Sequence, residues 1–227
     1  MMRTKKQSQS RRDFMRACLL AGAALAVPRW VSSGRAGGAL DHRRGVFHTV
    51  EPVPAETAIL SPDLNIIPRS KWVAYAPRLS LVKPASVFTR LTVHHAGAGI
   101  NMHLRQDDVV FDLNGILEGH LQKDYGDIGY HFIVDRAGRI WEGRSLAYEG
   151  AHVSGMNEQN IGVMLLGNFE EQQPAADQIS ALFILVDILR EKYDISGESV
   201  YGHCDLGQSA CPGRHLYVPY LAELKQS

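Results

Sequence analysis

The chain has 227 residues, of which 45% are hydrophobic and 21% are charged. This size and composition suit one globular domain with a substantial hydrophobic core. Basic and acidic residues balance at 24 each, so the chain lacks the basic excess that nucleic-acid binding requires, and we expect no nucleic-acid partner.

The first residues predict export. The run Ser10-Arg11-Arg12-Asp13-Phe14 follows a basic start and precedes an uncharged stretch at 17–27, which is the layout of a twin-arginine signal peptide. This stretch is too short for a transmembrane helix, which needs about 20 apolar residues. We therefore predict a signal peptide over residues 1–36, a location in the periplasm or cell wall, and no stable membrane span after processing.

Processing would change the charge and the cysteine content. Removal of residues 1–36 would take away eight Lys and Arg but only one acidic residue, Asp13, and would leave 16 basic and 23 acidic residues. Of the three cysteines, Cys204 and Cys211 would remain, which excludes the disulfide framework of small secreted domains. Residues 37–62 have no sustained hydrophobic period, so we interpret them as a linker or N-terminal arm before a domain at 63–227.

The rest of the chain alternates patterns that are typical of strands and helices. We predict strands at 87–93, 131–134, 139–142, 161–166 and 200–201. Apolar residues at helical spacing predict helices around 110–121 and 175–193. Gly138 lies in the turn of a hairpin between the second and third strands. Strands interleaved with helices predict a single α/β domain, with a mixed central β-sheet flanked by helices.

Two histidines and a cysteine predict a metal site. His94 and His203 each close a β-rich segment, and Cys211 lies eight residues beyond His203. Imidazole nitrogens and a thiolate are donors that Zn²⁺ prefers, and three protein ligands leave a fourth position for a reactive water. The sequence has no CxxC pair or HExxH helix to support this set locally. A hydrogen-bonded buried histidine at 94 and a disulfide between Cys204 and Cys211 are the alternatives.

A series of motifs over roughly 150 residues resembles, in order, the zinc amidases related to peptidoglycan recognition proteins and phage lysozyme-type amidases. The motifs are Ile67-Pro68-Arg69-Ser70-Lys71-Trp72, Leu91-Thr92-Val93-His94-His95, Asp127-Ile128-Gly129-Tyr130-His131-Phe132, Glu142-Gly143-Arg144, Gly150-Ala151-His152, Asn160-Ile161-Gly162-Val163, Gly202-His203-Cys204-Asp205 and Cys211-Pro212-Gly213. The resemblance implies an α/β amidase fold and one catalytic Zn²⁺ on His94, His203 and Cys211.

The resemblance also implies the reaction, which is hydrolysis of the amide bond between N-acetylmuramic acid and L-alanine in peptidoglycan. Tyr130 matches a tyrosine that faces the scissile carbonyl in catalytic relatives, where its phenol can donate to a developing oxyanion. Ser209 stands where many of them have lysine or threonine, and its uncharged hydroxyl would stabilise the transition state less than lysine would. A core aromatic residue and an ordinary loop serine are the alternatives. We expect peptidoglycan or muropeptides as partners of a monomeric protein.

Three further residues are candidates for substrate binding. His152 matches a histidine near the substrate groove of relatives, and an ordinary loop histidine is the alternative. Arg144 would bind a substrate carboxylate through two hydrogen bonds or form a surface salt bridge. His95 would lie on the opposite face of its strand from His94, which favours a structural or ligand-supporting role over a substrate contact.

Asp205 would orient a metal ligand or form an Asx turn.

Two other functions are compatible with these motifs. A non-catalytic peptidoglycan-binding module would typically lack the cysteine ligand, which is present here as Cys211. A metal-independent cysteine peptidase would use Cys211 or Cys204 with a histidine base, but we expect neither cysteine at the helix start usual for such nucleophiles. The zinc amidase is therefore the favoured function.

Overall fold

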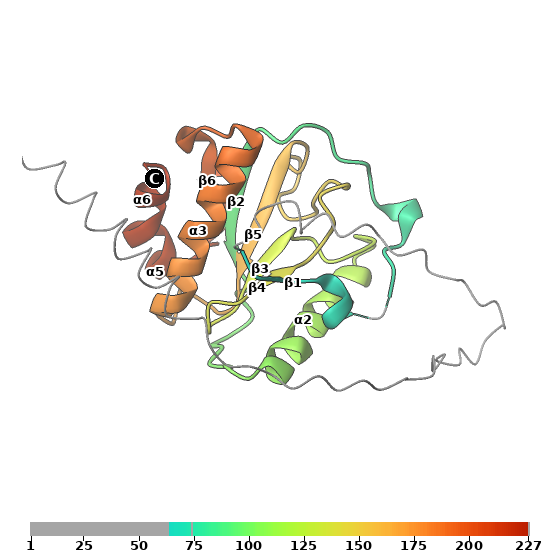
Figure 1. Cartoon of the computed structure of the whole chain (residues 1–227), viewed down its shortest axis with the longest axis horizontal. Helices are drawn as coiled ribbons and strands as arrows, with labels where there is room; N and C mark the ends of the chain where they lie inside the picture. The colour runs from blue at the N-terminus through green and yellow to red at the C-terminus, as the bar shows by residue number, and fades with distance from the viewer. Residues whose placement is uncertain (1–63, 74, 227) are drawn as a thin grey trace, which may run out of the picture. The chain divides into compact units, whose positions relative to one another are not determined.

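The computed structural model describes residues 64–73 and 75–226 (Figure 1). The predicted signal peptide at 1–36 and the linker at 37–62 lie outside these residues. Among the residues described, no helix combines the length and the apolar character that a membrane crossing requires.

Six strands form one sheet in the order β1-β4-β3-β5-β2-β6. They are β1 (Ile66–Ile67), β2 (Arg90–His95), β3 (Phe132–Val134), β4 (Ile140–Glu142), β5 (Asn160–Leu165) and β6 (Val200–Gly202). The neighbours β3, β5, β2 and β6 pair in parallel, β4 is antiparallel to β3, and β1 is parallel to β4. The sheet is therefore mixed, as predicted.

Helices cover both faces of the sheet (Figure 1). On one face, α3 (Ala176–Tyr193), α5 (Arg214–Leu216) and α6 (Ala222–Leu224) pack with alternate residues of β2 and β5 in one buried cluster. On the other face, α2 (Gln106–Leu121) packs against a second cluster that includes residues of β3, β4 and β5. Parallel strands need such crossover connections, because the chain must return to the same end of the sheet.

The remaining elements are short. They are the 3-10 helices Arg69–Lys71, Leu79–Leu81 and Gly197–Ser199, the helix α4 (His203–Leu206) and the π-helix Tyr217–Leu221.

The predicted elements are confirmed, with small shifts at their ends. β2 begins three residues later than expected and continues through His95, and the hairpin turn has Gly138 at a positive φ of 77°. The sequence did not predict β1 or the short helices after β6. A two-residue strand shows no alternation, and a helix of three or four residues shows no 3.6-residue period, so neither leaves a readable pattern.

The parallel pairing of β2 and β6 positions the two histidines at one edge of the sheet. Val93 pairs with Gly202, so His94 and His203 follow the paired positions directly and emerge at the carboxyl ends of neighbouring strands. The alternation of β2 buries Leu91 and Val93 in the cluster under α3. His94 therefore points to the other face.

Candidate metal centre

The structure brings His94, His203 and Cys211 together. One ligand atom from each residue lies within 4.8 Å of the others. His94 is buried at 1% exposure, and the other two are half-buried. His203 begins α4 directly after β6, and Cys211 returns to the site on the loop between α4 and α5.

The distance between two of the donor atoms fits a tetrahedral zinc ion. Nδ1 of His94 lies 3.6 Å from Sγ of Cys211. Zinc–nitrogen bonds of about 2.1 Å and zinc–sulfur bonds of about 2.3 Å, at a tetrahedral angle, place nitrogen and sulfur about 3.6 Å apart. The two distances agree, so these atoms are positioned to share one ion.

The protonation states of the ligands also fit a metal. Burial lowers the pKa of His94 well below its ordinary value, and the neighbouring His152 and His203 lower it further. The imidazole is therefore neutral, the form that binds metal ions. Burial raises the pKa of the Cys211 thiol to about 12, although the backbone N–H of His95 donates to Sγ at 3.3 Å and acts in the opposite direction. A bound cation would favour the thiolate, because metal binding releases the thiol proton.

Tyr130 lies beside the cluster. Its ring centroid is 5.2 Å from that of His94 and 5.6 Å from that of His120. Burial raises the pKa of Tyr130, and the nearby Cys211 raises it further. The phenol therefore keeps its proton at neutral pH and is a hydrogen-bond donor next to the ligand His94.

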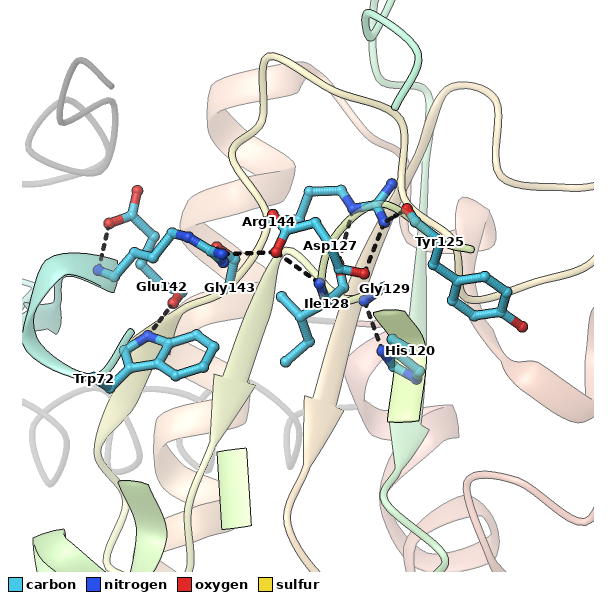
Figure 2. Close-up of polar contacts among 10 residues, drawn as sticks. Trp72, His120, Tyr125, Asp127, Ile128, Gly129, Glu142, Gly143 and Arg144 are labelled. Atoms are coloured by element: carbon cyan, nitrogen blue, oxygen red, sulfur yellow. Dashed lines mark hydrogen bonds and ion pairs between the residues drawn. The ribbon is translucent and has the colours of Figure 1, made fainter. Parts of the chain in front are cut away.

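The loop before Tyr130 is fixed by Arg144. Its guanidinium donates to the carbonyl oxygens of Ile128 at 2.8 Å, Glu149 at 2.7 Å, Tyr125 at 2.7 Å and Asp127 at 3.1 Å. Figure 2 shows this side chain beside the backbone of that loop. Arg144 is only 3% exposed. Both interpretations of Arg144 from the sequence are therefore wrong: it is too buried for a surface salt bridge, and its donors are committed to the protein instead of a substrate carboxylate.

A second set of contacts to this loop was not predicted from the sequence. Nη2 of Arg69 forms an ion pair with Oδ1 of the fully buried Asp127 at 2.7 Å. Nδ1 of His120 accepts a hydrogen bond from Gly129 N at 2.9 Å (Figure 2). Both Arg69 and Asp127 belong to recognised motifs, but nothing in a single sequence shows that residues 58 positions apart form a pair.

The family model described as "N-acetylmuramoyl-L-alanine amidase" (Amidase_2) matches residues 85–214. The chain belongs to this amidase family.

Individual relatives agree with this assignment. The chain is 34% identical over 166 residues to a peptidoglycan-recognition protein of Drosophila simulans, covering 71% of this chain and 86% of that protein. Among solved structures, the amidase LysC from Clostridium intestinale matches with a TM-score of 0.57 and 28% identity, covering 71% of this chain and 95% of that one. Peptidoglycan recognition protein LE, solved with monomeric diaminopimelic acid-type peptidoglycan, matches with a TM-score of 0.61 and 27% identity, covering 71% and 93%. The α/β amidase fold is thereby confirmed.

His152 of this amidase-family domain is a buried residue beside the metal cluster. It is 8% exposed. Its Nδ1 lies 2.9 Å from Nε2 of His94, and its Nε2 lies 3.2 Å from the carbonyl oxygen of Asn160. Both ring nitrogens have partners inside the protein, and a contact of His152 with a substrate peptide stays a prediction.

His95 lies on the opposite face of β2 from the metal cluster, as the alternation predicted. Its Nδ1 accepts a hydrogen bond from Phe169 N at 3.1 Å, and its ring packs against Phe169. The side chain is 9% exposed. His95 is therefore structural in the amidase domain, and its inclusion among substrate-binding residues is corrected.

Asp205 and Ser209 support the loop that carries the second and third ligands. Oδ2 of Asp205 accepts from Gly202 N at 2.9 Å, and Tyr217 donates to Oδ1 at 2.5 Å. The carboxylate of Asp205 thus reaches back three residues to the N-cap of α4, whereas an Asx turn, one of the two alternatives for this residue, would bind backbone further along the chain. Ser209 Oγ accepts from Cys211 N at 3.1 Å. A hydrogen bond from Ser209 to substrate stays a prediction.

The two cysteines of the amidase domain are free thiols, so the alternative of a Cys204–Cys211 disulfide is wrong. Cys204 lies in the first turn of α4, which the sequence analysis did not expect. Burial raises the pKa of its thiol, whereas a nucleophilic cysteine needs a lowered one. The cysteine peptidase alternative therefore gains no support from this helix.

Proposed function

We propose that this protein hydrolyses the amide bond between N-acetylmuramic acid and L-alanine in peptidoglycan, using one zinc ion bound by His94, His203 and Cys211. The observation that carries the proposal is the cluster of these three side chains, whose ligand atoms lie within 4.8 Å of one another, with Nδ1 of His94 3.6 Å from Sγ of Cys211. Membership of the amidase family supports the reaction, and a relative solved with a peptidoglycan fragment supports the substrate.

When bound, zinc would lower the pKa of a water ligand toward about 7 and polarise the substrate carbonyl. The residues of the chain supply the rest. His94 and His203 stay neutral because burial lowers their pKa values, and Cys211 contributes the negative charge. Tyr130 keeps its proton and donates a hydrogen bond to the carbonyl oxygen as negative charge develops there. Ser209, on the loop of Cys211, is a second and uncharged donor.

We further propose that the protein acts outside the cytoplasm. The support is the sequence of residues 1–36, in which paired arginines precede a short apolar stretch. Export would place the active domain next to the peptidoglycan polymer and inside the compartment where this substrate is found.

The experiment is mass spectrometry of the products formed when the purified protein is incubated with peptidoglycan. We expect free stem peptides that begin with L-alanine, no release after full chelation of the metal, and recovery when zinc is restored. Cys211→Ser is expected to abolish release, whereas the matched variant Cys204→Ser is expected to retain it.

Two results would contradict the proposal. Binding to peptidoglycan without cleavage, by protein shown to contain zinc, would favour a recognition module. Cleavage that survives complete removal of metal would favour a thiol nucleophile.

A further inference from the structure

We propose that His152 is a positioning residue for the metal ligand His94, holding its imidazole so that Nδ1 faces Cys211. This inference rests on the proposed zinc site. It concerns a residue for which the sequence predicted a contact with substrate.

The direction of the hydrogen bonds follows from one atom. The carbonyl oxygen of Asn160 can only accept, so the Nε2 of His152, 3.2 Å away, carries a proton. In a neutral imidazole the other nitrogen is then an acceptor. Nδ1 of His152 therefore accepts from Nε2 of His94 at 2.9 Å.

The hydrogen bond to His152 also determines which nitrogen of His94 carries the proton. With its proton on Nε2, the lone pair of its neutral ring lies on Nδ1, the atom 3.6 Å from Sγ of Cys211. A chain of two hydrogen bonds, from His94 through His152 to a backbone carbonyl, thus selects the tautomer that can bind metal through Nδ1. Such partners of ligating histidines also raise ligand basicity, and their loss typically costs 10–100-fold in metal affinity.

The surrounding residues hold the His152 ring in this place. The side-chain oxygen of Asn157 accepts hydrogen bonds from the backbone N–H groups of His152 and Val153, both at 2.8 Å. Two glycines provide the space. A Cβ atom at Gly162 would lie 2.6 Å from Cδ2 of His152, and one at Gly150 would also collide with the ring. The ring meets that of His94 edge to face, at an interplanar angle of 84°.

A pair of variants with the same shape tests the hydrogen bond. His152→Asn keeps an acceptor oxygen close to the position of Nδ1, whereas His152→Leu has nearly the same outline and no acceptor. Zinc affinity is measured by competition with a chromophoric chelator. We expect the leucine variant to bind zinc 10–100-fold more weakly and the asparagine variant to stay within about threefold of the wild type.

His120→Asn is the matched control, because His120 is another partly buried histidine that contacts Tyr130 but for which no contact with a ligand is found among the described residues. We expect its zinc affinity to be unchanged. The proposal is overturned if the leucine variant binds zinc as tightly as the wild type, or if the asparagine variant loses as much affinity as the leucine variant.

Nitrogen-15 NMR of the zinc-loaded wild type tests the same idea without a substitution. We expect a proton on Nε2 of His94 and metal on Nδ1, and a proton on Nε2 of His152. A proton on Nδ1 of His152 would refute the inference. If the wild type binds zinc and cleaves peptidoglycan but carries a proton on Nδ1 of His152, the positioning role is refuted and the proposed function stands. If the wild type binds no zinc, both the positioning role and the proposed function are refuted.

Discussion

Arg144→Met removes the side chain that organises the loop before Tyr130. In the native protein the guanidinium donates to four backbone carbonyl oxygens at 2.7 to 3.1 Å and is 3% exposed. Methionine fills much of the same volume but offers no donor. The substitution therefore leaves four backbone carbonyl groups without the hydrogen bonds that the Arg144 guanidinium donates.

The size of the effect follows from the number of bonds lost. At a net value of about 1 kcal/mol for each hydrogen bond, the four together are worth about 4 kcal/mol. The total stability of a domain is typically about 5–15 kcal/mol, so the loss is large. We also expect slower cleavage by the remaining folded protein, because the loop carries Tyr130, with little change in zinc affinity.

The assay is urea unfolding of the metal-free protein, with Arg136→Met as the matched control. Arg136 is half-buried and its Nη1 donates to Gln173 O at 3.4 Å, so its removal should change the free energy of unfolding by no more than about 0.5 kcal/mol. A loss below about 1 kcal/mol for Arg144→Met, with an unchanged m-value, would refute the role assigned to Arg144.

Three further predictions follow from buried groups near the site. Burial lowers the pKa of His131 from 6.5 to about 4. Between these pH values the unfolded state binds more protons than the folded state, so the folded protein loses stability as the pH falls. We expect the contribution of His131 to the free energy of unfolding to be complete above about pH 6.5 and to decrease by about 2 kcal/mol from pH 7 to pH 5. An NMR titration that gives His131 a pKa near 6.5 would contradict this. Asp127→Asn removes the negative charge that pairs with the Arg69 guanidinium and should lower the free energy of unfolding by about 3 kcal/mol in denaturant melts; an unchanged midpoint would exclude the ion pair as a stabilising contact. Tyr130→Phe should lower the cleavage rate by about 10²–10³-fold while the competition assay shows unchanged zinc affinity, and a rate equal to that of the wild type would remove Tyr130 from catalysis.

Local patterns predicted much of the fold. The alternation in β2 correctly separated His94 from His95, and the glycine at 138 correctly marked the hairpin. The cluster of His94, His203 and Cys211 could be predicted because these residues are chemically distinctive and stand in recognisable motifs. These signals depend on residue type and near neighbours, both of which a sequence displays.

Long-range side-chain contacts could not be predicted in this way. His152 and His94 are 58 residues apart, and Arg144 reaches carbonyl groups on a loop 16 to 19 residues earlier in the chain. A backbone carbonyl has no residue-type signal, so a side chain that binds several of them resembles any surface arginine. The burial of Arg144, which excludes a surface salt bridge, and the burial of His152 beside His94 are properties of the packed structure.

The most direct test of the zinc amidase is a titration of metal-free protein with zinc while the rate of stem-peptide release is followed. We predict no release at the start, a linear rise, and a plateau at one zinc per chain, with no release at any zinc concentration for Cys211→Ser. Full activity of the metal-free protein, or a protein that takes up zinc and binds peptidoglycan without cleaving it, would contradict the account.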